Sequence, residues 1–141
     1  EFGEGTSFQE VIDDTTPERG AAERISRLIF CSGKVYYDLL EYRRKHEITN
    51  AAIIRLEQIY PFHADRVAEI AAGYPNATKW VWCQEEPLNM GAWTFVGPRL
   101  QKISELRVRY AGRDTASSPS SGSKAIHKKE QYRLLDEAFS K

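Results

Sequence analysis

The apolar residues of this chain fall into short continuous runs that alternate with longer stretches in which they recur every three or four residues. Short runs rich in β-branched and aromatic residues predict buried strands, here at 27–32, 51–59 and 79–84. Helical spacing, closed by stop signals such as Gly73 and Pro75, predicts helices at 33–46, 63–72, 91–105 and 124–139. Strands that alternate with helices are typical of a parallel sheet covered by helices.

Two weaker segments complete the predicted sheet. Residues 106–112 alternate polar and apolar side chains, which is typical of an edge strand with one face in water. Residues 8–12 form a possible edge strand inside a stretch, 1–25, whose polar and glycine-rich composition is typical of a linker. We therefore predict a linker at 1–25 and one α/β domain at 26–141, with about five strands in all.

Composition and charge narrow the classes of partner. Twenty basic and twenty acidic side chains cancel, so no field of one sign would attract nucleic acid or an anionic membrane. No apolar run approaches the roughly 20 residues of a membrane span. Cys31 and Cys83 match no metal or redox spacing, which favours small core residues, with a disulfide as the alternative. The chain begins at Glu1 and its single methionine is Met90, so we expect a piece of a longer or processed protein.

Polar side chains follow each of the three central strands. They are Ser32, Gly33 and Lys34, then Glu57 and Gln58, then Gln84, Glu85 and Glu86, with Asn89 shortly after. Ligands bind beyond the carboxyl ends of parallel strands, so we expect one polar edge with a functional role. Half-buried carboxylates need partners such as backbone amides or an arginine, and Arg55 and Arg113 are the candidate arginines. The alternative is that Glu85 or Glu86 caps the helix near Gly91 or makes a purely structural ion pair.

Five runs of residues carry a family resemblance. They are C-S-G-K-V-Y-Y-D-L-L, R-L-E-Q-I-Y-P-F, W-C-Q-E-E-P-L-N-M-G-A-W, R-Y-A-G-R and S-S-P-S-S-G-S-K-A-I-H-K-K-E-Q. In this order, over residues 27–139, the chain resembles the C-terminal domain of the thiamine-dependent decarboxylase component of 2-oxoglutarate dehydrogenase, a member of the transketolase superfamily. The resemblance implies a three-layer α/β/α sandwich around a mixed, mostly parallel five-stranded sheet. Residues 8–12 would then be its antiparallel strand.

The resemblance also implies an activity for the complete enzyme. Such an enzyme oxidatively decarboxylates 2-oxoglutarate on thiamine diphosphate and magnesium, and passes the succinyl group to the lipoyl arm of a succinyltransferase core in the tricarboxylic acid cycle. The G-D-G motif that binds diphosphate and magnesium is absent here, so the upstream domains would hold both cofactors. We expect no catalytic residue in this chain and no activity from it alone. The full enzyme is expected to be a homodimer in the cytoplasm of a bacterium or in the mitochondrial matrix.

A regulatory site is the remaining expectation at the polar edge. The resemblance implies such a site, because some members of the family are regulated by nucleotides or acetyl-coenzyme A through the C-terminal region. The candidate anion-binding residues here are Ser32, Gly33, Lys34, Arg55 and Arg113. The turn at Ser32 resembles the end of a phosphate loop, but Leu28 and Val35 stand where that motif needs glycine and Ser or Thr, so we exclude ATP hydrolysis. The alternative overall function is a free-standing module that binds an anion or nucleotide without catalysis.

Three other constellations fit structural roles better. The histidines His46, His63 and His127 are too scattered for a metal motif. A hydrolytic triad of Ser118, His127 and Asp136 lacks the sharp turn that exposes a nucleophile. Trp80, Trp82 and Trp93 could form a stacking platform for nucleic acid. Because Trp80 and Trp82 share one face of their strand, packing in the core explains them better.

Overall fold

The computed structural model describes residues 10–16, 19–113 and 124–140. Its five strands are β1 (Val11–Ile12), β2 (Arg27–Cys31), β3 (Ala51–Leu56), β4 (Lys79–Pro87) and β5 (Arg109–Arg113). They form one sheet in the order β1-β3-β2-β4-β5, in which only β1 runs antiparallel to its neighbour. The predicted mixed, mostly parallel sheet with an antiparallel edge strand is confirmed, although residues 8–9 lie outside the described part.

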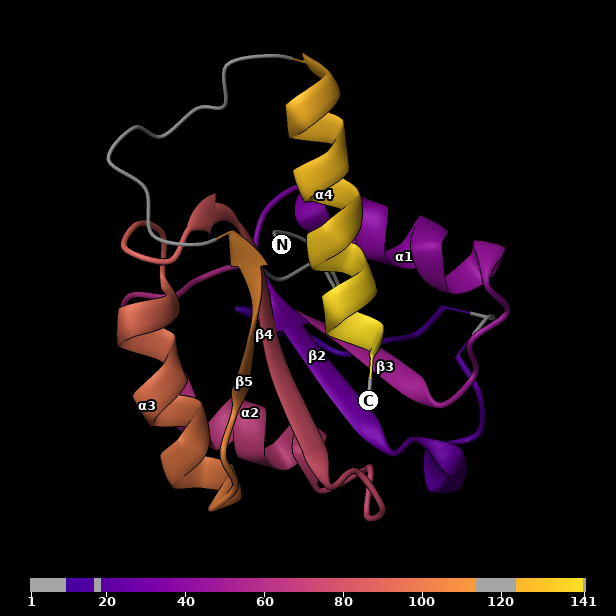
Figure 1. Ribbon diagram of the computed structural model, residues 1–141. Coiled ribbons are helices and arrows are strands. Elements are labelled where there is room, and N and C mark those ends of the chain that lie inside the picture. Colours follow the sequence, from indigo (N-terminus) through magenta and orange to yellow (C-terminus); the bar gives the residue numbers. More distant parts are fainter. Residues whose placement is uncertain (1–9, 17–18, 114–123, 141) are drawn as a thin grey trace, which may run out of the picture.

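Four α-helices cover the sheet on both faces. They are α1 (Val35–Lys45), α2 (Ala64–Ala71), α3 (Trp93–Ser104) and α4 (Lys124–Phe139), preceded by a short 3-10 turn at Ala22–Arg24. Helices α1 and α4 lie on one face, and α2 and α3 lie on the other (Figure 1). The sandwich of three layers expected from the family resemblance is therefore confirmed.

Each face of the sheet has its own apolar core because successive side chains of a strand point to opposite sides. On β2, Leu28 and Phe30 belong to the core beneath α2 and α3, whereas Ile29 and Cys31 belong to the core beneath α1 and α4. Trp80 and Trp82 of β4 are 5% and 1% exposed. Both tryptophans are thus core residues, as their alternation predicted.

The two cysteines are sheet neighbours. Cys31 on β2 and Cys83 on β4 are register partners, and both are buried as free thiols. Burial raises the pKa of both thiols, since no water is left to solvate a thiolate. They are inert core residues, and the alternative of a disulfide is wrong.

Several element boundaries differ from the predicted ones. Strand β3 ends at Leu56, before the turn in which the Gln58 side chain donates to the Tyr60 carbonyl at 3.1 Å. Strand β5 begins at Arg109, because the preceding backbone amide, that of Val108, donates to the side chain of Gln101 on α3 at 3.1 Å. At Val108 this side-chain bond replaces the ladder bond that a longer strand would make.

The stretch predicted as a linker also differs from expectation. Its described residues contribute to the core of the domain, since Val11 and Ile25 are 1% and 0% exposed. Asp14 is only 2% exposed and binds groups of α1 and β3. Residues 10–16 and 19–25 are therefore an integral part of the fold. Within the described ranges, no helix combines the length and the apolarity needed to cross a bilayer.

Candidate functional site

The polar ends of the central strands lie along one edge of the sheet. Strands β2, β3, β4 and β5 are parallel, and Cys31 is in register with both Arg55 and Cys83. Strands β2 and β3 therefore end side by side, while β4 continues past them to Pro87. We call this edge the strand-end rim and define it by Ser32–Lys34, 57–58, Gln84–Glu86 and Arg113. Helix α4 begins beyond the rim, so its first half overhangs it (Figure 1).

Glu85 links three elements at the rim. Its Oε1 lies 3.7 Å from Lys34 Nζ at the start of α1. Gln131 of α4 donates from Nε2 to Glu85 Oε1 and to Asp38 Oδ2, both at 2.9 Å. Because the Lys34 side chain is 83% exposed, its ion pair with Glu85 is screened by water and contributes little stability. Lys34 is therefore the most accessible cation among the predicted site residues.

The two candidate arginines do not pair with Glu85 or Glu86, and this prediction is wrong. Arg55 Nε lies 2.9 Å from Glu57 Oε2, without hydrogen-bond alignment, and its guanidinium lies over the Tyr36 ring at 4.5 Å. Strand β2 separates β3 from β4 in the sheet, so Arg55 pairs with Glu57 just after its own strand and not with the glutamates of β4.

Arg113 is also occupied by helix α4. Its Nη2 lies 2.9 Å from His127 Nδ1, and its Nε lies 3.7 Å from Glu130 Oε1. The overhanging half of α4 therefore supplies the partners of Arg113. Arg55 and Arg113 thus each face a carboxylate of the same domain, and their positive charge is largely compensated within it.

Gln84 organises the segment that joins β4 to α3. Its Oε1 accepts from Trp82 Nε1 at 2.8 Å and from the backbone N–H of Trp93, the first residue of α3, at 3.1 Å. Its Nε2 lies 2.9 to 3.0 Å from the carbonyl oxygens of Glu86, Pro87 and Met90. Gln84, and not Glu85 or Glu86, thus caps α3, which corrects the predicted helix cap.

Gly91 lets the chain pass close to Gln84. Its φ of +72° lies in the left-handed region, and a Cβ at this position would lie 3.1 Å from both Gln84 Oε1 and Glu86 Oε1. Exposed Asn89 lies in the same turn. The sequence holds one signal for this arrangement. Gln84 stands at the end of an apolar run, two residues after Trp82 and seven residues before Gly91.

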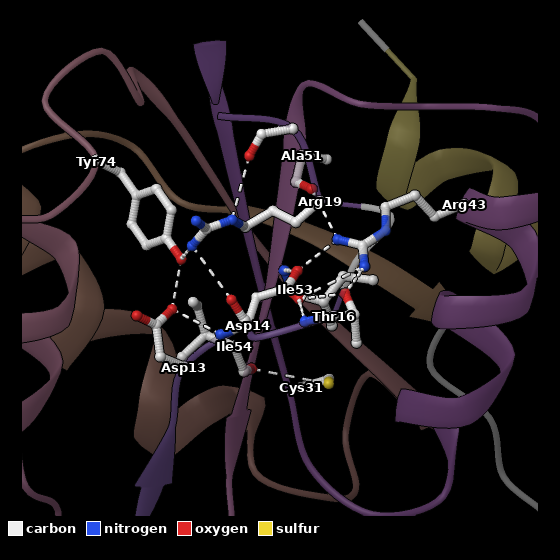
Figure 2. A network of polar contacts seen from close by, with 11 residues as sticks. Asp13, Asp14, Thr16, Arg19, Cys31, Arg43, Ala51, Ile53, Ile54 and Tyr74 are labelled. Atoms are coloured by element: carbon white, nitrogen blue, oxygen red, sulfur yellow. Dashed lines mark hydrogen bonds and ion pairs between the residues drawn. The ribbon is translucent and has the colours of Figure 1, made fainter. Parts of the chain in front are cut away.

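A second polar cluster lies away from the rim, where β1 ends. We call it the Asp13–Asp14 network (Asp13, Asp14, Thr16, Arg19, Arg43 and Tyr74; Figure 2). Asp14 forms an ion pair with Arg43 of α1, and both side chains are almost fully buried. Its Oδ2 also accepts from the Ile53 N–H at 2.8 Å, while Arg43 donates to the Ala51 carbonyl at 2.9 Å. Asp14 thereby ties β1, β3 and α1 together.

Asp13 makes the corresponding contact with the opposite helix layer. It accepts a hydrogen bond from the hydroxyl of Tyr74, which follows α2, and the same hydroxyl accepts from Arg19 at 2.7 Å (Figure 2). Burial and the bond to Asp13 raise the pKa of Tyr74, because both disfavour the phenolate. Two adjacent aspartates therefore hold helices from both faces of the sheet.

The other candidate chemistries involve the histidines, Asp136 and Ser118. The described residues contain no group of three or more His, Cys, Asp or Glu side chains placed to hold a metal. Asp136 accepts from the Tyr42 hydroxyl at 2.6 Å, and His127 contacts Arg113. Ser118 lies outside the described residues. The exclusion of a hydrolytic triad therefore stays a prediction.

Known proteins resemble the chain over nearly its whole length. A family model described as 2-oxoglutarate dehydrogenase C-terminal matches residues 1–139. The 2-oxoglutarate dehydrogenase E1 component of Cupriavidus necator is 46% identical over 136 residues, which are 95% of this chain and 14% of that protein. That of Rickettsia typhi is 44% identical over 99% of this chain and 15% of its own length.

Two further comparisons come from a eukaryote and from a solved structure. A probable 2-oxoadipate dehydrogenase complex component E1 homolog of Dictyostelium discoideum is 45% identical over 99% of this chain and 16% of that protein. A split-gene transketolase, solved as an inactive beta4 tetramer, superposes with a TM-score of 0.61 at 18% identity, covering 87% of this chain and 42% of the other, and shows the shared fold. The chain therefore belongs to the family of 2-oxoglutarate dehydrogenase C-terminal domains.

Proposed function

We propose that this chain is the C-terminal domain of a thiamine diphosphate-dependent 2-oxoglutarate dehydrogenase component, in which it supplies architecture instead of catalytic groups. The observation that carries the proposal is the family match over residues 1–139. The curated relatives are about six to seven times longer than the matched part, which leaves room in such a protein for other domains to bind the cofactors.

The geometry of the rim supports an architectural role. Gln131 contacts both Glu85 and Asp38, and Arg55 and Arg113 each face a carboxylate. These side chains are thus held by one another and not arranged as an acid–base or a nucleophile–base pair. The side chains instead join α1, β4, β5 and α4.

The finer parts of the proposal concern cofactors, partners and location. In the complete enzyme, upstream domains bind thiamine diphosphate and magnesium, two copies form a dimer, and the succinyl group passes to a lipoyl succinyltransferase core. The enzyme works in the cytoplasm of a bacterium or in a mitochondrial matrix. The anion site at Ser32, Gly33, Lys34, Arg55 and Arg113 also stays a prediction, with Lys34 as the most accessible member.

The experiment compares the longer protein with this chain. Each is purified and assayed for ferricyanide reduction that depends on 2-oxoglutarate, thiamine diphosphate and Mg²⁺. We expect turnover from the longer protein and none from the 141 residues alone. Turnover by the short chain would overturn the architectural role. A longer protein without turnover would instead favour the alternative of a regulatory module that binds an anion.

A further inference from the structure

A groove runs between α3 and β5, away from the strand-end rim's charged contacts. Its volume is about 680 Å³. Its apolar and aromatic walls come from Leu88, Trp93, Val108 and Tyr110. Helix α3 and β5 lie beside each other in Figure 1, and β5 is the last strand at its end of the sheet. The groove therefore follows an edge strand, which is the arrangement that accepts an additional strand.

The groove is positively charged. Gln101, Arg107 and Arg109 are its polar lining residues, and no carboxylate lines it among the described residues. The Arg109 guanidinium is bound by the carbonyls of Glu137 and Ser140 on α4. Exposed Arg107 makes no hydrogen bond or ion pair with any residue that the structure describes. Arg107 is thus the cation that a ligand in the groove would meet.

Two other occupants fit less well. Trp93 and Tyr110 pack against each other, with ring centroids 5.4 Å apart, so they leave no slot for a stacked base. A second copy would place the segment R-V-R-Y-A-G-R, residues 107–113, against itself. Like charges on facing strands repel, so this strand disfavours self-pairing and favours an acidic partner.

We propose that the edge of β5 and its groove bind an extended segment of a partner protein, in which one acidic side chain meets Arg107 and the neighbouring apolar side chains meet Leu88 and Trp93. The backbone of that segment adds a strand beside β5. This recognition is independent of the proposed enzyme function, because it uses neither the strand-end rim nor any cofactor.

The test uses the 141-residue chain and labelled peptides in fluorescence polarisation. The probe is a fluorescein-labelled peptide in which valine and threonine alternate around one central glutamate. Its first matched control has glutamine in place of the glutamate, and its second has alternate backbone amides N-methylated. We expect the glutamate peptide to bind more tightly than the glutamine peptide, by about fivefold at low salt. N-methylation removes the strand donors and should abolish binding.

Protein variants locate the contact. Arg107→Glu should weaken the glutamate peptide by about fivefold or more. Lys102→Glu makes the same change of charge at an exposed position on α3, which does not line the groove, and should change affinity less than about twofold. Thermal melts that match those of the unchanged chain exclude unfolding. Equal binding of all three peptides, no effect of Arg107→Glu, no binding at millimolar peptide, or a dimer blocked by Arg107→Glu would each overturn the proposal.

Discussion

The Asp13–Asp14 network and the strand-end rim use the same kinds of charged groups in opposite surroundings. In the network, the paired side chains of Asp14 and Arg43 are 1% and 0% exposed. At the rim, those of Glu85 and Lys34 are 20% and 83% exposed. A buried ion pair is strongly destabilising to break, whereas an exposed one is worth little. The network therefore holds the fold, and the rim can change its contacts without unfolding the domain.

The largest expected effect is at Asp14. Asp14→Ala leaves Arg43 charged and buried without its partner, and leaves the Ile53 N–H without an acceptor. We expect the free energy of unfolding to fall by about 3 to 5 kcal/mol. Urea unfolding followed by circular dichroism measures it.

The matched control is Asp65→Ala, which removes an exposed aspartate of α2. Its expected loss is below about 0.5 kcal/mol. Equal losses for Asp14→Ala and Asp65→Ala would mean that burial does not separate the network from ordinary surface charges.

The second effect is at Gln84, which belongs to the rim by position but to the core by burial. Gln84→Ala removes the acceptor of Trp82 Nε1 and of the Trp93 N–H, and the donor to three carbonyl groups. We expect a loss of about 2 to 3 kcal/mol. Gln58→Ala, which removes one exposed bond to the Tyr60 carbonyl, should lose less than about 0.5 kcal/mol. A loss for Gln84→Ala as small as that for Gln58→Ala would show that Gln84 does not hold the turn.

Alkaline pH should weaken the network through Tyr74. Its pKa is raised in the fold, so above the ordinary tyrosine value of about 10 the unfolded chain loses this proton while the folded chain keeps it. The free energy of unfolding then falls as pH rises, by up to about 1.4 kcal/mol per pH unit for this one group. Tyr74→Phe should make the fall shallower in urea unfolding between about pH 9 and 11.

The control for Tyr74 is Tyr60→Phe, because the Tyr60 side chain is 64% exposed. This variant should keep the slope of the unchanged chain. An identical slope for all three proteins would exclude Tyr74 as a source of the alkaline loss.

The smallest expected effect is at Glu85. Glu85→Gln keeps an acceptor for Gln131 and weakens only the exposed pair with Lys34, so the loss should be below about 1 kcal/mol. In the longer enzyme, a fall in turnover at an unchanged melting temperature would assign Glu85 a role in function. A fall in both together would assign it to structure and remove the contrast between rim and network.

The sequence predicts the sheet well because apolar runs report burial directly. Arg27–Cys31 and the two tryptophans of β4 alternate as two-sided core strands should, and parallel pairing then places Lys34, Gln58 and Glu86 at one edge. Local patterns are sufficient for these features, since each depends on the period of one strand and on the direction of its neighbours.

The partners of the charged groups could not be predicted in the same way. Arg43 lies on a helix that looks amphipathic, and its pairing with Asp14 depends on how β1 docks against β3 and α1. Polar composition concealed Asp14 within a stretch expected to be a linker. The role of Gln84 was likewise not predictable, because its hydrogen bonds to residues two and nine positions away leave no periodic signal in the sequence.

The most direct measurement is the coupling energy of two ion pairs by double-mutant cycles in urea unfolding. Asp14 and Arg43 are changed to alanine singly and together, and the same is done for Lys34 and Glu85. We predict a coupling of about 2 kcal/mol or more for the buried pair and below about 0.5 kcal/mol for the rim pair. Equal couplings, or a larger one at the rim, would contradict the division between a network that holds the fold and a rim that is free to serve another purpose.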